Sequence, residues 1–150
     1  MQRSLLDLPN VVGRRLFTFI LSQEIHKATR LQYPLSILCL TPDLKGRATS
    51  ASFTDRLARL SAAQVRATDL AASLGPASVA ILLIDAETRN LTGIFRRLTE
   101  GLELLPAPTL SGGGGCYPQT ATGGGELLEQ AIELMRRAKA EGGDRLSLPT

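Results

Sequence analysis

The segment from Arg66 to Ile84 constrains the fold more than any other part of the chain. Asp69–Ser73 is predicted to be a short strand, and Gly75-Pro76 supplies the residues of a tight turn. Val79–Ile84 follows as a continuous apolar run, which is typical of a strand buried on both faces. The segment therefore predicts a β-hairpin, entered from a helix that ends just before it.

The rest of the chain alternates between helical and strand patterns. Apolar residues at helical spacing predict helices over 13–31, 53–65, from 85 or 86 to 104, and 126–140. Short apolar runs beside proline or glycine predict further strands over 35–40, 110–116 and 145–148. A hairpin combined with helical crossovers predicts an α/β sandwich with a mixed five-stranded sheet flanked by helices. The length is that of one domain, spanning residues 1–150.

Two glycine runs interrupt this pattern. The strand predicted from residue 110 runs into Gly112–Gly115, and Gly123–Gly125 precedes the last helix. Both runs are interpreted as loop. Neither is followed by the Lys-Ser/Thr pair that a phosphate-binding loop requires, so we expect no ligand role for Gly112–Gly115.

Composition narrows the function only a little. Hydrophobic residues make up 43% and charged residues 21% of the chain, which is typical of a globular protein, and the net charge of +3 does not by itself indicate a nucleic acid or membrane partner. Lysine occurs only at positions 27, 45 and 139, so most positive charge is arginine. Arginine suits bidentate contacts with phosphate or guanine, although a GC-rich genome produces the same bias.

No residue set indicates a disulfide, a metal or a membrane span. Cys39 and Cys116 are expected to be small buried side chains in a reducing cytosol. His26 lies in a helical stretch and is expected to be structural or solvated, and no metal-ligand spacing is present. The apolar run 16–21 is too short to cross a bilayer, and no signal peptide is visible, so a cytoplasmic location is expected.

Several segments together resemble the GGDEF domain, the fold of bacterial diguanylate cyclases. Asp7–Asn10 followed by Arg14–Phe17 is similar to the family's entry motif, Leu-Thr-Gly-Leu-Pro-Asn-Arg-Arg. Residues 34–40 resemble the family's first strand, and residues 65–70 resemble the end of its second helix. Residues 111–113 are similar to its Ser-Ile-Gly strand, and residues 127–142 to its closing helix, Ala-Leu-Tyr-x-Ala-Lys-x-x-Gly. The resemblance covers nearly the whole chain and implies the same α/β fold.

The same resemblance implies that the catalytic apparatus has been lost. The signature turn Gly-Gly-Asp-Glu-Phe is replaced by Gly-Pro-Ala-Ser-Val at 75–79. In the family a metal pair held by carboxylates activates GTP. The corresponding positions here are Leu40 or Thr41, with Asp43 nearby, and Ala77. Leu, Thr and Ala cannot replace a carboxylate on a hard cation.

Two further losses concern nucleotide binding. Pro76 adds a ring and removes an N–H where the family has the glycine that lets the nucleotide approach the backbone. The stretch from Lys45 to Phe53 is too short to carry the family's Asn-Asp…Gly-His…Gly-Asp loop for guanine and ribose. We therefore expect no cyclase activity.

One family feature is retained. Arg66 and Asp69 form an Arg-x-x-Asp motif with five residues between Asp69 and Gly75, the spacing of the family's inhibitory site for cyclic di-GMP. Arg97, with Arg96 beside it, matches the second arginine of that site. Arginine can bind a phosphate or the guanine O6/N7 edge, and aspartate can accept from guanine N1–H and N2–H.

A structural interpretation of these residues stays open at this point. Arg66 and Asp69 would then form a surface ion pair that caps the helix, worth well under about 1 kcal/mol. Arg96 and Arg97 would be part of a solvated helix face.

Three hypotheses for function follow. The first is a catalytically inactive GGDEF domain that binds cyclic di-GMP, without cofactor, and acts on a separate effector chain or through homodimer formation. The second is a scaffold or protein-interaction module with the same fold that binds no nucleotide. The third, an enzyme of another class, has neither a nucleophile–base set nor a metal cluster to support it. A nucleic acid polymer is not an expected partner.

Overall fold

The computed structural model describes residues 11–44, 51–75, 77–101 and 109–150. Along the chain, helices and strands alternate except at the β3–β4 hairpin. Their order is β1 Val11–Val12, α1 Arg14–Leu31, β2 Leu35–Pro42, α2 Ala51–Ala63, β3 Leu70–Gly75, β4 Ser78–Ile84, α3 Thr88–Gly101, β5 Leu110–Tyr117, α4 Gly124–Ala140 and β6 Arg145–Ser147.

The sheet has six strands in the order β1-β3-β4-β2-β5-β6. The hairpin β3–β4 is antiparallel, and β2 lies antiparallel to both β4 and β5. The two edge strands, β1 and β6, run parallel to β3 and β5. The predicted mixed α/β fold is confirmed. The sixth strand, Val11–Val12, was not predicted, because two residues are too few to show an alternating pattern.

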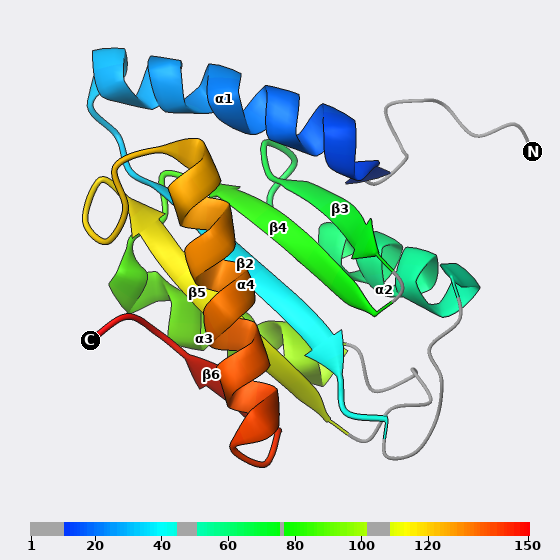
Figure 1. Cartoon of the computed structure of the whole chain (residues 1–150). Coiled ribbons are helices and arrows are strands. Elements are labelled where there is room, and N and C mark those ends of the chain that lie inside the picture. Colours follow the sequence, from blue (N-terminus) through cyan, green and yellow to red (C-terminus); the bar gives the residue numbers. More distant parts are fainter. Residues whose placement is uncertain (1–10, 45–50, 76, 102–108) are drawn as a thin grey trace, which may run out of the picture.

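Helices cover both faces of the sheet, with α1 and α4 on one face and α2 and α3 on the other (Figure 1). The strands β2 and β4 explain this arrangement, since their side chains alternate between the two cores. Ile37 and Leu82 pack with α1 and α4, whereas Leu38 and Ile81 pack with α2 and α3. Burying one such side chain stabilises the fold by roughly 1.5–3 kcal/mol.

The strand predicted over 110–116 is confirmed as β5, and the glycine run 112–115 is part of it, so the interpretation of that run as loop was wrong. A Cβ atom at Gly113 would lie 2.1 Å from the backbone nitrogen of Met135 in α4, and one at Gly112 would lie 2.7 Å from the ring of Phe95 in α3. Helix α4 therefore approaches β5 at Gly113 more closely than any side chain allows, and the Phe95 ring of α3 fills the space beside Gly112. These glycines are required by packing and not by a turn.

The remaining predicted boundaries agree with the structure within a few residues. The hairpin strands are longer than predicted, and β3 ends at Gly75, whose φ of 149° is rarely adopted by other residues. The predicted continuation of the third helix to Leu104 and the entry motif at Asp7–Asn10 lie outside the described residues. Cys39 and Cys116 are both buried and unpaired, as predicted.

Candidate ligand-binding site

A cavity of about 520 Å³ lies at the open end of the β3–β4 hairpin, where β3 begins and β4 ends. We call it the open-end cavity. Its apolar lining comes from the α2–β3 connection, β4 and α3, through Val65, Leu83, Ala86 and Ile94. Its polar lining consists of Arg66, Asp69, Asp85, Asn90 and Arg97. Three of the four predicted site residues thus meet in one cavity, whose size is ordinary for a small-molecule site.

Asp69 is the most deeply buried polar residue of this cavity. It lies just before β3, and only 2% of its surface is exposed. Its Oδ1 accepts from the backbone N–H of Ile84 at 2.9 Å, and its Oδ2 accepts from the backbone N–H of Arg66 at 3.1 Å. The carboxylate therefore ties the end of β4 to the turn that leads into β3. The local Arg66–Asp69 ion pair that the structural interpretation expected is therefore present, although its carboxylate is buried and not at the surface.

Arg66 lies above this carboxylate and is largely exposed. Residues 66–69 form a turn closed by a hydrogen bond from Asp69 N to Arg66 O at 2.9 Å. The guanidinium donates through Nη2 to the carbonyl oxygen of Ile84, and its Nε lies 3.6 Å from Asp69 Oδ2. The side chain is 60% exposed, so an anion could reach it from solvent.

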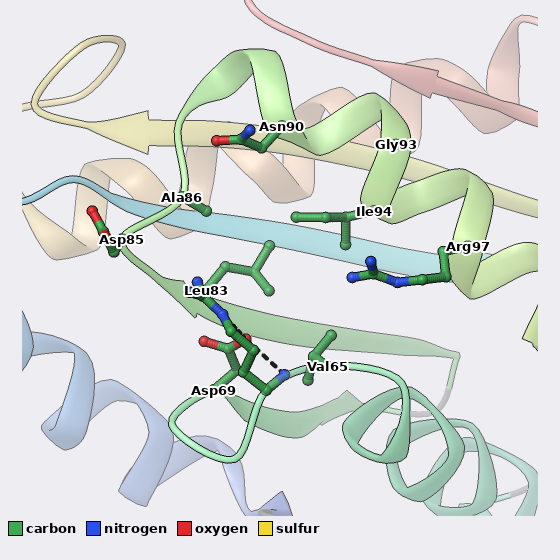
Figure 2. A pocket seen from close by; sticks show the side chains of 10 residues that line it. Val65, Asp69, Leu83, Asp85, Ala86, Asn90, Gly93, Ile94 and Arg97 are labelled. Atoms are coloured by element: carbon green, nitrogen blue, oxygen red, sulfur yellow. Dashed lines mark hydrogen bonds and ion pairs between the residues drawn. The ribbon is translucent and has the colours of Figure 1, made fainter.

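Arg97 belongs to the opposite wall, formed by α3. Figure 2 shows its side chain extending below Ile94 toward Leu83, into the cavity. Among the described residues it has no ion-pair partner. Arg96, its neighbour on the same helix, is exposed and does not line the cavity. The structure therefore brings Arg66, Asp69 and Arg97 together and leaves Arg96 outside.

Two polar residues of the cavity were missed by the sequence analysis. Asp85 follows β4 with φ of 57° and lies at the edge of the cavity in Figure 2. Asn90, on the first turn of α3, accepts the N–H of Glu87 with its Oδ1 at 2.8 Å. The Asp in a turn position after β4 and the Asn two residues into the helix are common capping residues, so neither carried a functional signal.

A second cavity, of about 330 Å³, lies at the other end of the same hairpin, where Gly75, Ala77 and Ser78 lie. We call it the turn-end cavity. Its charged lining is formed by Arg14 from α1 and by three α4 residues, Glu129, Arg136 and Lys139. This is the position at which the resemblance places the catalytic metal pair.

The residues at this position do not fit a metal pair. Thr41 Oγ1 donates to the carbonyl oxygen of Ala77 at 2.7 Å, so the two positions that the resemblance assigns to carboxylates are adjacent and hold one hydroxyl and one methyl group. Thr41, rather than Leu40, faces the turn. Across the described parts of the chain, no group of three or more His, Cys, Asp or Glu residues is arranged to hold a metal ion.

Asp43, the nearby carboxylate, is engaged elsewhere. It accepts from Thr109 Oγ1 at 2.5 Å, from Ser111 Oγ at 2.7 Å and from the N–H of Asp144 at 2.9 Å. Burial alone would raise its pKa. These hydrogen bonds and the positive charge of Lys139 outweigh that effect and hold the pKa below its ordinary value. Asp43 thus fastens β2 to β5 and to the turn before β6.

Comparison with known proteins identifies the fold. No protein-family profile matches the sequence, and no curated protein matches it. Among solved structures, the GGDEF domain of YfiN, also called TpbB, from Pseudomonas aeruginosa is 23% identical, with 97% of this chain and 99% of that chain covered and a TM-score of 0.77.

Two further solved structures lead to the same fold. The GGDEF domain of DgcB from Caulobacter crescentus, in complex with c-di-GMP, is 16% identical, with 99% and 95% of the two chains covered and a TM-score of 0.74. The active GGEEF domain of a diguanylate cyclase from Vibrio cholerae is 15% identical, with 91% and 96% covered and a TM-score of 0.77. At such identities the likeness establishes the fold: this chain has the GGDEF fold. No helix in the described ranges is both long and apolar enough to span a membrane.

Proposed function

We propose that the protein is a catalytically inactive GGDEF domain that binds cyclic di-GMP in the open-end cavity. The observation that carries the proposal is the convergence of Arg66 and Asp69, from the turn before β3, and Arg97, from α3, on one cavity. Two guanidinium groups on opposite walls suit a ligand that carries two phosphates. The complex of the DgcB GGDEF domain with c-di-GMP supports the choice of ligand, because that domain shares this fold.

Inactivity is proposed from the turn-end cavity. A metal-dependent attack on GTP needs carboxylates to hold the cations. Thr41 and Ala77 supply none at the two corresponding positions, and Asp43 is bound to Thr109 and Ser111. Incubation with GTP and Mg²⁺ is expected to yield no cyclic di-GMP. Any product above that of a protein-free control contradicts this half of the proposal.

Calorimetric titration tests binding. The wild-type protein is expected to bind cyclic di-GMP with micromolar or lower Kd, and Arg66→Ala to abolish detectable binding. Arg89→Ala is the matched control, since Arg89 lies on α3 like Arg97, is 82% exposed and does not line the cavity. No heat with the wild-type protein at high ligand concentration would favour the alternative, a nucleotide-free scaffold with the same fold.

Signalling then requires a change in association. We propose that ligand binding alters contact with a separate effector chain in the cytoplasm, or between two copies of this chain. Sedimentation equilibrium with and without cyclic di-GMP distinguishes the second case, because a ligand-dependent doubling of the mass in a pure sample reports self-association.

A further inference from the structure

A further cavity, of about 350 Å³, lies where α1 ends, β2 begins and β5 ends. We call it the tyrosine cavity, because the only two tyrosines of the chain, Tyr33 and Tyr117, both line it. Pro34 and Pro118 add to its apolar lining. Its volume is within the range of small-molecule sites. It shares no lining residue with the open-end cavity, so the proposed function does not account for it.

The register of β2 on β5 explains why the two tyrosines meet. Leu35, the first residue of β2, pairs with Tyr117, the last residue of β5, and Tyr33 precedes this pair by two residues. Both tyrosines also pack against the core that α1 and α4 form with the sheet. The rings therefore have a fixed place in the fold, which lowers the cost of ordering them around a ligand.

Both phenol groups donate their hydrogen to α1. Tyr33 Oη donates to Glu24 Oε2 at 3.1 Å. Thr29 Oγ1 donates to the carbonyl oxygen of Ile25 at 2.8 Å, so the hydrogen in its contact with Tyr117 comes from the tyrosine. Since a phenol has one hydrogen, neither ring can donate to an anion or to a ligand carbonyl group. The rings can offer π surface and oxygen lone pairs, and both attract positive charge.

The charge of the lining favours the same kind of ligand. Among the described residues that line the cavity, none is Lys, Arg or His, and the one charged residue is Glu87. Glu87 Oε2 lies 2.8 Å from Arg89 Nε, but the two side chains are 46% and 82% exposed, so water weakens this pair. Lys27 is bound to Glu24 at 3.0 Å and does not line the cavity. A carboxylate beside two tyrosine rings suits an organic cation.

We propose that the tyrosine cavity is a second binding site, and that its ligand is a small organic cation with a quaternary or alkylated ammonium group. Tyr33 and Tyr117 attract the positive charge through their rings, and the carboxylate of Glu87 balances it. Pro34 and Pro118 contact the alkyl groups. The site goes beyond the proposed function, and neither proposal depends on the other.

Tyrosine fluorescence tests the proposal directly, because the chain has no tryptophan and both of its tyrosines line this cavity. Choline chloride is titrated with total chloride held constant by sodium chloride. The control ligand is dimethylbutanol, the neutral analogue in which carbon replaces the choline nitrogen. We expect choline to cause a saturable change with Kd of about 1 mM or lower. The neutral analogue should bind about fivefold more weakly or not at all, because it lacks the attraction between cation and ring.

A matched pair of substitutions locates the site. Glu87→Gln removes the carboxylate of the cavity and should raise the Kd for choline about threefold or more. Glu133→Gln changes the net charge equally, but Glu133 is 72% exposed on α4 and does not line the cavity, so the Kd should stay within about 1.5-fold. Both replaced side chains are largely exposed, so neither substitution is expected to impair folding.

Three results overturn the inference. The first is the lack of a saturable change up to about 10 mM choline, tenfold above the expected Kd. The second is equal binding of choline and its neutral analogue, because the cavity would then select only for apolar shape. The third is an equal effect of Glu87→Gln and Glu133→Gln, which would indicate long-range attraction in place of a contact in this cavity. None of these results bears on the binding of cyclic di-GMP.

Discussion

The two ends of the β3–β4 hairpin carry different chemistry on the same pair of strands. At the open end, a buried carboxylate accepts two backbone N–H groups, and two arginines line the cavity beside it. At the turn end, Thr41 and Ala77 occupy the positions that the resemblance assigns to carboxylates, and a hydroxyl–carbonyl hydrogen bond joins them. The strands pair in register between these ends, from Leu70 with Leu82 to Ser73 with Val79. Side chains at a site can therefore change while the framework stays, as expected where function is carried by sites placed on a fold.

The largest effect is expected from a substitution in β5 that disturbs the packing of α4 on the sheet. Gly113→Ala places a methyl group 2.1–2.6 Å from the α4 backbone, which cannot move aside without shifting the whole helix. We expect a loss of about 3 kcal/mol in the free energy of unfolding, the upper end of the usual cost of overpacking. Urea unfolding followed by circular dichroism measures it.

Gly125→Ala is the matched control for this change. Gly125 lies on the first turn of α4, and a Cβ there meets nothing within 4 Å. Alanine should be neutral or should stabilise the helix by about 0.5–1 kcal/mol. Equal destabilisation by both substitutions would show that contact with α4 is not the reason for the glycines of β5.

The two ends themselves should differ in what a single substitution costs. Asp69→Ala leaves two backbone N–H groups without their acceptor, so we expect a loss of roughly 2–3 kcal/mol. Thr41→Val at the turn end removes one hydroxyl and its bond to Ala77, for about 1 kcal/mol. Urea unfolding of both variants ranks them, and a larger loss for Thr41→Val would reverse the comparison.

Recognition at the open end is tested by two neighbouring arginines. Arg97 lines the cavity and Arg96 does not, although both are exposed and both are on α3. Arg97→Ala should weaken cyclic di-GMP binding roughly tenfold or more, the worth of a charge-assisted contact, while Arg96→Ala should change Kd less than about twofold. Because the two substitutions alter net charge equally, a similar effect of both would indicate long-range attraction in place of a direct contact.

The sequence predicted those features whose cause is local. The run Val79–Ile84 indicates a buried strand because all of its side chains are apolar. Gly75 indicates the turn because glycine readily adopts a positive φ, which the structure shows there. The helix that carries Arg97 followed from the helical spacing of its apolar residues. In each case neighbouring residues decide the outcome, so pattern and structure agree.

Features that depend on distant segments were not predicted. Gly112–Gly115 is strand throughout because it pairs with β2, and the close approach of α4 at Gly113 cannot be inferred from a run of glycines. The burial of Asp69 depends on Ile84, fifteen residues further along the chain. Likewise, the engagement of Asp43 depends on Thr109 and Asp144, which only the finished fold brings together.

The smallest expected effect concerns the pH dependence of stability and Asp43, which follows strand β2. The folded-state pKa of Asp43 is lowered, so its ionised form is favoured in the native state. Its contribution to stability is fully present above the unfolded pKa of about 3.9 and is lost as pH falls through the lower folded value. We therefore expect Asp43→Asn to lower Tm at pH 7 and to leave the acid side of the Tm–pH profile flatter than that of the wild-type protein. Parallel profiles would show that Asp43 titrates alike in both states, and its bonds to Thr109 and Ser111 would no longer explain why this carboxylate is withheld from the turn-end cavity.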